Sequence, residues 1–331
     1  MPKIVCIKWF SDPPRTGGEM VFNIVCEALS TVLDVSVETY CDELRQDSTN
    51  ISKPITTVIN ATSNGVRRNQ IIRQYLKRGF DVYSNTLYGT LIYVQPRARL
   101  DITSAKIYIK YKDLIDKMTR LWRENIRLGV YNSNYTMKRF KIGKSVNNFV
   151  VYPPLIRDYG DSRFERRNMV LVLSRIGRTK NLELAGHLSE QIGNKVVLAG
   201  YLEKYDQSYY DYIKSRFRKL TILPNIDEDE KRRLLNEAEI VLATSNEEPF
   251  GMTKLEAMSA GAVPLVPNSG GWPEGVPEEF VFKDLEELKE KIKQYSSYSD
   301  ENLSRELKNL SKSFRLELFK ERIASLADKY M

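Results

Sequence analysis

The segment that most constrains the fold of this chain runs from Ser245 to Glu274 and reads SNEEPFGMTKLEAMSAGAVPLVPNSGGWPE. An apolar run at 239–243 leads into it, a helical stretch follows Gly251, and a second apolar run occupies 262–266. The order strand, loop, helix and strand is the local layout of a nucleotide-binding α/β domain. We therefore expect an α/β fold in which this segment forms part of a ligand site.

Two carboxylates of this segment, Glu248 and Glu256, lie on either side of a Phe-Gly pair that opens the helix. The first turn of the helix after Gly251 presents unpaired backbone N–H groups and a partial positive charge, which suit a phosphate. Glu256 lies about one and a half turns into the helix, where its carboxylate can accept hydrogen bonds from ribose hydroxyls. Glu248, ahead of the helix, would face the sugar end of the same ligand. The pattern favours a sugar-nucleotide site.

The spacing of these residues resembles that of the retaining glycosyltransferases of family 4. The matching pattern is S-x2-E-x-F-G-x4-E-A-M-x2-G-x2-P followed by G-G-x2-E. Its members here are Ser245, Glu248, Phe250, Gly251, Glu256, Ala257, Met258, Gly261, Pro264, Gly270, Gly271 and Glu274. The alternative is an ordinary acidic helix with capping glycines. The resemblance implies a GT-B fold, in which two Rossmann-like doubly wound domains face a central cleft.

A pair of basic residues, Arg175 and Lys180, follows the predicted strand 169–174 in the sequence LSRIGRTKNLEL. Across a strand-to-helix turn both can point at one phosphate group, which arginine can bind in a bidentate manner. The spacing is similar to the R-x4-K of the family, which neutralises the diphosphate of the donor. Arg178 is the competing arginine, and we expect it to be solvated.

The resemblance implies a role for each matching residue. Glu248, Arg175 and Lys180 would be catalytic. The donor would be bound by residues on both domains, namely Gly17, Gly18, Arg175, Lys180, Phe250, Gly251, Met252, Thr253 and Glu256. Gly17 and Gly18 match the glycine loop of the family's first domain, although a plain turn before a helix would read the same way.

No metal or cofactor is expected. The Asp-x-Asp pair Asp227 and Asp229 lies just after a strand, at the start of a predicted helix, where acidic residues complement the helix dipole and supply a cap. The single histidine, His187, falls within a helix and is interpreted as a surface or packing residue. The positive charges that offset the leaving group would then come from the protein itself. On resemblance, the expected donors are GDP-mannose first and UDP-glucose second.

Three further segments resemble the mannosyltransferases that extend lipid-linked oligosaccharides. They are LIYVQPRA, GVYNSNYT and VVYPP, and Glu19 after the two glycines also matches some of these enzymes. One departure concerns Gln95, which stands where the family segment carries a histidine. Glutamine can hydrogen-bond a sugar hydroxyl but is not a base near neutral pH. Acceptor handling and sugar preference are therefore open.

The chain of 331 residues is long enough for two domains and a helical tail. We predict a basic, acceptor-side Rossmann-like domain at 1–150, a nucleotide-sugar-binding Rossmann-like domain at 151–300, and helices at 301–331. The resemblance implies that these last helices pack back toward the first domain. The tandem prolines of VVYPP mark the crossover between the domains.

Apolar runs separated by turns predict the elements of both domains. In the first, strands are predicted at 3–9, 35–39, 57–60, 81–83, 90–95 and 129–132, and helices at 20–33, 67–77, 105–128 and after 132, the last capped by Asn132, Ser133 or Asn134. In the second, strands are predicted at 169–174, 195–199, 220–223, 239–243 and 263–266, and helices at 181–192, 206–218, 228–236, 252–260 and through most of 285–330.

Charge is unevenly distributed along the chain. The net charge is +8, yet residues 60–150 hold 18 Lys and Arg against 5 Asp and Glu. An anionic partner is one explanation, which could be a lipid surface, a phosphorylated acceptor or a nucleic acid, and a lysine-rich soluble surface is the other. The amphipathic segment 105–128 has the same two interpretations: a helix that covers the core, or one that docks on anionic lipid near Trp122.

Three cysteines, Cys6, Cys26 and Cys41, without a Cys-x2-Cys pair favour reduced thiols, and we expect Cys6 and Cys26 to be buried. No run of apolar residues is long enough for a transmembrane helix. These features indicate a cytoplasmic protein, which could also bind peripherally to the inner face of a membrane.

The sequence therefore predicts a metal-independent retaining glycosyltransferase that moves mannose or glucose from a nucleotide-diphosphate sugar to a glycan or lipid-linked acceptor. The alternatives are a synthase acting on soluble sugars, a DNA-modifying glycosyltransferase, a nucleic-acid-binding protein that uses the basic first domain, and a non-catalytic homologue. A nucleic-acid role is less favoured, because no basic-aromatic recognition motif appears.

Overall fold

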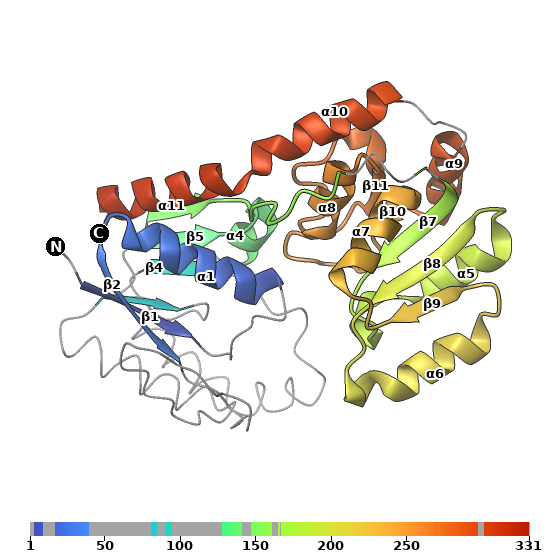
Figure 1. Ribbon diagram of the computed structural model, residues 1–331, viewed down its shortest axis with the longest axis horizontal. Coiled ribbons are helices and arrows are strands. Elements are labelled where there is room, and N and C mark those ends of the chain that lie inside the picture. Colours follow the sequence, from blue (N-terminus) through green and yellow to red (C-terminus); the bar gives the residue numbers. More distant parts are fainter. Residues whose placement is uncertain are drawn as a thin grey trace. The chain divides into compact units, whose positions relative to one another are not determined.

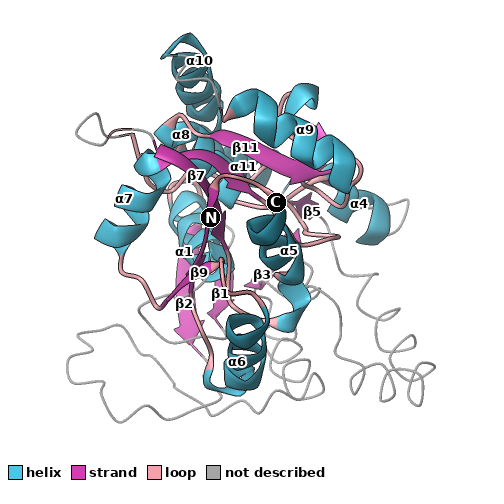
Figure 2. Cartoon of the chain, turned by 90° about the vertical axis from the view of Figure 1, so that its right-hand side faces the viewer, coloured by secondary structure: helices cyan, strands magenta, loops and turns pink. Residues whose placement is uncertain are grey.

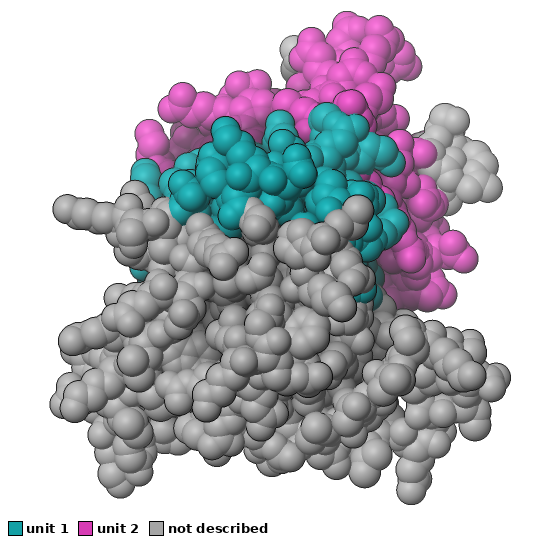
Figure 3. Space-filling view, turned by 90° about the vertical axis from the view of Figure 1, so that its left-hand side faces the viewer, with its two compact units in different colours: residues 1–153, 317–331 teal, residues 154–316 magenta. Residues whose placement is uncertain are grey.

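The structure is a computed structural model that describes residues 3–8, 17–39, 81–84, 91–94, 128–140, 147–160, 165, 167–296 and 301–330 (Figure 1). The chain forms two compact units, coloured separately in Figure 3: unit 1 comprises residues 1–153 and 317–331, and unit 2 comprises residues 154–316. The predictions for Gln95, Cys41, the strand 57–60, the helix 67–77 and nearly all of the amphipathic segment 105–128 lie outside the described residues.

Unit 1 is built on a parallel sheet with the strand order β2-β1-β3-β4-β5-β6. Its strands are β1 Lys3–Lys8, β2 Asp34–Thr39, β3 Asp81–Ser84, β4 Leu91–Val94, β5 Leu128–Tyr131 and β6 Asn147–Val150. Its helices are α1 Gly17–Ser30, α4 Asn134–Phe140 and α11 Leu316–Tyr330. The predicted strands that fall in the described residues are confirmed to within one or two residues at each end.

Helix α1 follows the first strand of unit 1 and buries one face. Phe22, Val25 and Leu29 recur at helical spacing and are almost fully buried. Cys6 and Cys26 are both buried, as the sequence predicted. Helix α4 begins after Ser133, whose Oγ accepts a hydrogen bond of 2.9 Å from the backbone N–H of Thr136. Of the three candidate caps, Ser133 is therefore the one used.

Unit 2 is a second parallel sheet, with the strand order β12-β11-β10-β7-β8-β9. Its strands are β7 Arg167–Leu173, β8 Lys195–Gly200, β9 Thr221–Pro224, β10 Ala238–Leu242, β11 Val263–Pro267 and β12 Val281–Phe282. Its α-helices are α5 Glu183–Gln191, α6 Gln207–Arg216, α7 Glu228–Glu237, α8 Thr253–Ala260, α9 Leu285–Tyr295 and α10 Glu301–Ser311. The alternating series of strands and helices predicted for 169–266 is confirmed.

The strand order of unit 2 reverses at β7. From β7 the chain winds outward to β8 and β9, then returns to β10 on the other side of β7 and continues to β11 and β12. Because such crossovers are right-handed, the helices cover both faces of the sheet, and Figure 2 shows helices on both sides of the strands. The connections that follow β7 and β10 therefore run in opposite directions along the sheet, which makes the carboxyl ends of these two strands a topological switch point.

The helical tail divides between the two units. Helix α10 packs against α8 in unit 2 and buries Leu307 and Ser311. Helix α11 belongs to unit 1, where Phe319, Ile323 and Ala327 are buried. The sequence analysis predicted that 301–331 pack together toward the first domain, whereas the structure places α10 in unit 2, because its apolar face packs against α8.

Every helix in the described part of the chain is too short or too polar to cross a bilayer.

Candidate active site

The loops after the carboxyl ends of β7 and β10 carry most of the residues that the sequence predicts for the site. These two strands are parallel neighbours in the sheet. The loop after β7 carries Arg175 and Lys180, and the loop after β10 carries Glu248 and leads into α8. In doubly wound sheets, ligands bind at such a reversal of strand order.

Two hydrogen bonds join these loops at their base. Asn181 has a left-handed backbone (φ 51°), and its Nδ2 donates to the carbonyl of Thr244 at 3.1 Å. The hydroxyl of Thr244 donates in return to the carbonyl of Lys180 at 2.7 Å. Asparagine tolerates this backbone region better than most residues. The sequence prediction missed both residues, because only the fold brings them together.

The predicted phosphate-binding lysine and the predicted sugar-binding glutamate meet directly. Lys180 Nζ lies 2.7 Å from Glu248 Oε2, and the hydroxyl of Ser245 donates to the same oxygen at 3.0 Å. Each of the two charged side chains is 20% exposed. Both are therefore held in place and still reachable by a ligand. Their separation in sequence, 68 positions, makes this contact a test of the predicted fold.

Arg175 has different partners in the structure. Its Nη1 donates to the hydroxyl of Tyr205 at 2.8 Å, and its Nη2 donates to the hydroxyl of Thr179 at 3.3 Å. The guanidinium and the ammonium of Lys180 thus sit in one loop but contact separate groups. Arg178 is exposed and lies 5.2 Å from the ring centroid of Tyr209, which agrees with the solvated position expected for it.

The loop that carries Glu248 rests on the turn at 268–272. The backbone N–H of Gly271 donates to the carbonyl of Glu248 at 2.7 Å, and the N–H of Glu247 donates to the hydroxyl of Ser269 at 3.0 Å. Gly270 has a φ of +63°, and a Cβ there would lie 2.6 Å from the Glu248 carbonyl oxygen. Gly270 and Gly271 therefore pack directly against the backbone of the loop that carries Glu248 and hold it in place.

A buried lysine, Lys254, ties these two loops together and was missed by the sequence prediction. Its side chain is 1% exposed. Its Nζ donates to the carbonyls of Phe250, Gly271 and Trp272 at 2.6, 2.8 and 3.2 Å. Burial holds the pKa of Lys254 well below its usual range, although Glu274 and Glu248 oppose this shift. A lysine in the apolar stretch of a helix was the signal available in the sequence.

The residues that open α8 differ in what they can offer a ligand. The ring of Phe250 is buried and lies 3.8 Å from Lys254 Nζ, so it is part of the core. Gly251 has a φ of +83°, and a Cβ there would overlap the ring of Trp272. Met252 occupies the N-cap without a side-chain cap hydrogen bond, and Thr253 is the first helical residue. The first N–H groups of α8 have no partners within the helix.

Glu256 points its carboxylate toward α7. Its Oε1 lies 2.7 Å from Lys231 Nζ, and the glutamate side chain is 17% exposed. The sequence did not predict the lysine partner, because Lys231 looked like one more charged residue in the run PNIDEDEKRRLL.

The structure places Gly17 and Gly18 at the start of a helix and not in the loop that the sequence predicted. The sequence placed Gly17 and Gly18 in a loop before a helix starting at Met20, but α1 begins at Gly17. The first N–H groups of a helix have no partners within it, so glycines can form its first turn at little cost. The loop reading is therefore corrected to a helix start, while a donor-binding role for the two glycines stays a prediction.

The Asp-x-Asp pair is a helix start, as predicted. Asp227 Oδ1 accepts a hydrogen bond of 2.8 Å from the N–H of Glu230 and caps α7, and Asp229 lies in the first turn. His187 is exposed, and its ring packs edge-on to Phe217 at 5.0 Å, as expected for a packing residue. Within the described ranges, no three His, Cys, Asp or Glu side chains are grouped so that they could hold a metal ion.

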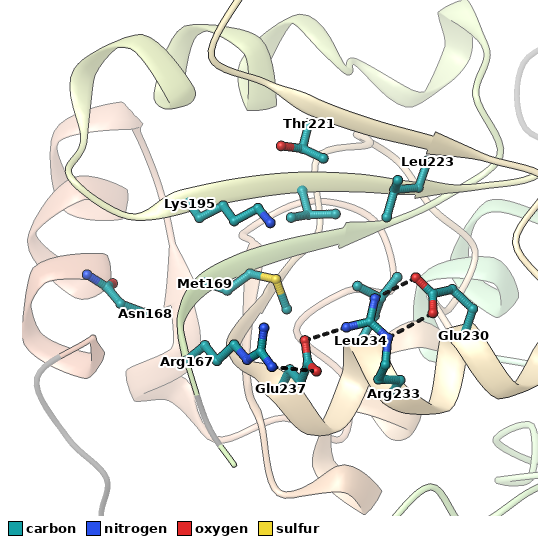
Figure 4. Close-up of a pocket in the computed structure, with 11 residues that line it drawn as sticks. Arg167, Asn168, Met169, Lys195, Thr221, Leu223, Glu230, Arg233, Leu234 and Glu237 are labelled. Carbon is teal, nitrogen blue, oxygen red and sulfur yellow. Dashed lines mark hydrogen bonds and ion pairs between the residues drawn. The ribbon is translucent and has the colours of Figure 1, made fainter. Parts of the chain in front are cut away.

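A separate cavity of about 250 Å³ lies at the opposite, amino-terminal edge of the same sheet (Figure 4). It is surrounded by charges that pair with one another: Arg233 bonds Glu230 and Glu237, and Glu237 also pairs with Arg167 at 3.3 Å. None of the predicted site residues lines it. We therefore assign the candidate active site to the carboxyl ends of β7 and β10.

Comparisons with known proteins show which family and fold this chain is similar to. Residues 160–313 match the family described as glycosyl transferases group 1. A GDP-Man:Man(3)GlcNAc(2)-PP-Dol alpha-1,2-mannosyltransferase of Dictyostelium discoideum is 24% identical over 224 residues, which is 60% of this chain and 43% of that relative. This chain thus spans less than half the length of that curated relative.

Two solved structures share the fold over nearly the whole chain. A sucrose-phosphate synthase from Thermosynechococcus elongatus has a TM-score of 0.73 at 14% identity and covers 99% of both chains. HepE from Anabaena, in complex with UDP and glucose, has a TM-score of 0.71 at 14% identity and covers 99% of this chain and 100% of its own. The α/β fold of the GT-B type predicted from the sequence is confirmed.

Proposed function

We propose that this chain, whose residues 160–313 match the family of glycosyl transferases group 1, is a retaining hexosyltransferase that uses a nucleotide-diphosphate sugar. The hexose would be mannose or glucose, and the acceptor a glycan or a lipid-linked saccharide. The observation that carries the proposal is the 2.7 Å contact of Lys180 with Glu248 at the reversal point of the unit 2 sheet. It sets a phosphate-binding cation beside a carboxylate suited to a sugar.

Positive groups of unit 2 would offset the charge of the leaving diphosphate. When the bond between the anomeric carbon and the diphosphate oxygen breaks, that oxygen gains negative charge. Lys180, Arg175 and the N–H groups at the start of α8 supply fixed positive charge. The partners of Arg175 in the structure are two neutral hydroxyls. A phosphate binds guanidinium more strongly than hydroxyls do, so it would replace them.

Glu248 would stabilise the positive charge that develops on the anomeric carbon. Ser245 and Lys180 both contact its Oε2 and fix its orientation. The acceptor oxygen would attack the same face from which the diphosphate leaves, and the leaving phosphate would take the acceptor's proton. The anomeric configuration is then retained. We propose that no metal takes part, because Asp227 is engaged as a helix cap and protein cations serve the diphosphate.

We propose GDP-mannose as the first donor to test and UDP-glucose as the second. The sequence resemblance and the name of the Dictyostelium relative support GDP-mannose. The complex of HepE with UDP and glucose supports a uridine nucleotide. A donor that binds only the folded state raises the melting temperature.

A thermal-shift series tests the proposal. The protein would be titrated with GDP-mannose, UDP-glucose and ADP-glucose, each with and without EDTA. We expect one donor to raise the melting temperature by the same amount with and without the chelator. Transfer to an acceptor would then be followed by release of the nucleoside diphosphate, and the product anomer would be assigned by NMR. A protein that is stabilised by none of the donors would contradict the proposal.

We also propose that the protein is cytoplasmic and binds peripherally to the anionic inner face of a membrane. This part of the proposal rests on charge alone. Residues 60–150 carry the excess of Lys and Arg. Surface electrostatics of this kind weaken with ionic strength. We expect the protein to sediment with anionic liposomes at low salt and less so at 0.5 M salt. A protein that stays in the supernatant at low salt would remove the membrane from the proposal.

A further inference from the structure

We propose that Lys231 and Tyr159 are positioning residues for Glu256, and that they set the affinity of the site for the ribose of the donor. This inference rests on the proposed function, in which Glu256 accepts hydrogen bonds from ribose hydroxyls. Neither residue belongs to the motif that marks the site. They come from α7 and from the segment 154–160, which precedes β7, while Glu256 lies in α8.

Lys231 makes two contacts at once. Its Nζ lies 2.7 Å from Glu256 Oε1 and 2.9 Å from the hydroxyl of Tyr159. Lys231 Nζ also lies 4.7 Å from the ring centroid of Tyr159, within the range of a cation–π contact. The lysine side chain is 22% exposed. Such an ammonium, held by two partners, fixes the direction from which it approaches the carboxylate.

Tyr159 is itself immobilised by the core of unit 2. It is 3% exposed. Its carbonyl accepts a hydrogen bond of 2.6 Å from Asn236 Nδ2, and its N–H donates to the hydroxyl of Ser259 at 3.3 Å. Because Asn236 is in α7 and Ser259 is in α8, the tyrosine is tied to both helices that carry the other two members.

The network reaches further toward the start of unit 2. Glu228, the first residue of α7, pairs with Arg157 at 3.4 Å. Burial, together with Glu256 and Glu228, raises the pKa of the Tyr159 hydroxyl, which therefore keeps its proton near neutral pH. The protonated hydroxyl of Tyr159 can then accept the hydrogen bond from Lys231 Nζ.

A fixed carboxylate matters for ribose because two neighbouring hydroxyls must be met in one geometry. A free glutamate side chain would lose rotamer entropy on binding, and this loss weakens affinity. In this chain Lys231 and Tyr159 hold the Glu256 side chain in one rotamer before a ligand binds. The contact that does so joins Lys231 Nζ to Glu256 Oε1. Their removal should weaken binding only of ligands whose ribose hydroxyls reach Glu256.

The test compares Lys231→Met and Tyr159→Phe with wild type, and Lys289→Met serves as the control. Lys289 pairs with Glu286 at 2.9 Å on the surface helix α9 and contacts none of the network. Binding of GDP and UDP, and of their 2′,3′-dideoxy forms, would be measured by calorimetry. We expect about a tenfold loss of affinity for the ribonucleotide in each network variant, since charge-assisted hydrogen bonds are involved.

The dideoxy nucleotides separate positioning from a general structural effect. Wild type and Lys231→Met should bind them equally, because no hydroxyl is left to report on Glu256. In transfer assays the donor KM should rise while kcat stays within about threefold. Lys231→Met should also add no further loss in a Glu256→Ala background, because contacting residues are not additive.

The outcomes are distinct. Equal ribonucleotide affinity in wild type and both network variants overturns the positioning role and leaves the proposed function standing. An equal loss for ribonucleotide and dideoxy nucleotide also overturns it, because the effect would then be structural. A wild-type protein that binds neither GDP nor UDP contradicts the proposed function, and the inference fails with it. If Tyr159→Phe does not fold, Lys231→Met alone decides.

Discussion

At the scale of single residues, the contact between Lys180 and Glu248 is the centre of the site. The two residues come from loops after different strands, and each is 20% exposed. A largely buried charged pair is weak evidence for stability, because the cost of desolvating both charges offsets their attraction. Such a contact at the reversal of the strand order is better explained by function than by stability. Lys180 and Glu248 would separate when a diphosphate binds Lys180 and a sugar binds Glu248.

Substitution of this pair should abolish transfer without unfolding the protein. We expect Lys180→Met to lower kcat/KM by about 10²- to 10³-fold, the size of effect seen when a group that stabilises transition-state charge is removed. Glu248→Gln should act similarly, and the double variant should lose less than the product of the two. Steady-state kinetics measures this.

The matched control for Lys180 is in the same turn. Arg178→Met removes an exposed cation that packs on Tyr209 and should leave kcat/KM within twofold. An equal loss in Arg178→Met and Lys180→Met would mean that overall charge, and not the position of Lys180, drives binding.

The buried ammonium of Lys254 should matter for stability. Lys254→Met leaves three carbonyls, those of Phe250, Gly271 and Trp272, without this donor. Each unsatisfied buried acceptor costs about 1 kcal/mol, so we expect the free energy of unfolding to fall by about 2–4 kcal/mol. Urea denaturation measures it, and Lys289→Met on α9 should change stability by less than about 0.5 kcal/mol.

The stability contributed by Lys254 should also rise with pH. Its pKa is lowered in the folded protein, so between that pKa and the ordinary value of about 10.4 the unfolded chain binds more protons. In that window the free energy of unfolding increases with pH, and below the folded pKa this dependence ends. The difference between wild type and Lys254→Met should therefore grow as the pH rises from the folded pKa of Lys254 toward its ordinary value. A difference that shrinks over this range would contradict the lowered pKa.

At the scale of elements, helix ends show how local sequence becomes structure. Asp227 was predicted to cap a helix rather than to bind a metal, and the structure places its carboxylate on the N–H of Glu230. Ser133 and Asp284 cap α4 and α9 in the same way, each through the residue three positions on. Short polar side chains ahead of a helix are sufficient signals because the geometry is local.

Two variants test the role of Asp227 as the N-cap of α7. Asp227→Ala should lower the free energy of unfolding by about 1 kcal/mol, through loss of the N-cap. Asp229→Ala, in the exposed first turn of the same helix, should cost only a few tenths of a kcal/mol, from the helix dipole alone. Both variants should transfer sugar at the wild-type rate, with or without EDTA. A loss of activity in Asp227→Ala that added Mn²⁺ restores would instead indicate a metal ligand.

Elements were predictable where burial leaves a continuous pattern. Strands β7 and β10 are apolar on both faces, and their positions were predicted to within two residues. The start of α1 was missed, because glycine is normally read as a loop residue and the first turn of a helix makes few demands on it. The place of α10 was missed because an amphipathic pattern shows which face is buried but does not name the partner.

At the scale of the whole molecule, the motif predicts the residues of the candidate site but not the residues that support them. Glu248 and Glu256 were predicted from fixed spacings in one stretch of sequence, and Lys180 was predicted from its spacing to Arg175 in another. Lys231, Tyr159 and Lys254 were not, because each acts through residues that only the fold brings close. Arg175 was expected beside Lys180 on one group, whereas the structure shows it on Tyr205 and Thr179. A contact between residues that are far apart in the sequence gives no periodic pattern from which it could be predicted.

The most direct measurement is a crystal structure of the protein with a bound nucleoside diphosphate. We predict that a phosphate oxygen lies within about 3.2 Å of Lys180 Nζ, that the ribose hydroxyls contact Glu256, and that the ligand occupies the carboxyl ends of β7 and β10. A nucleotide bound elsewhere, for example in the cavity beside Arg233 at the amino-terminal edge of the sheet, would contradict the assignment of the site.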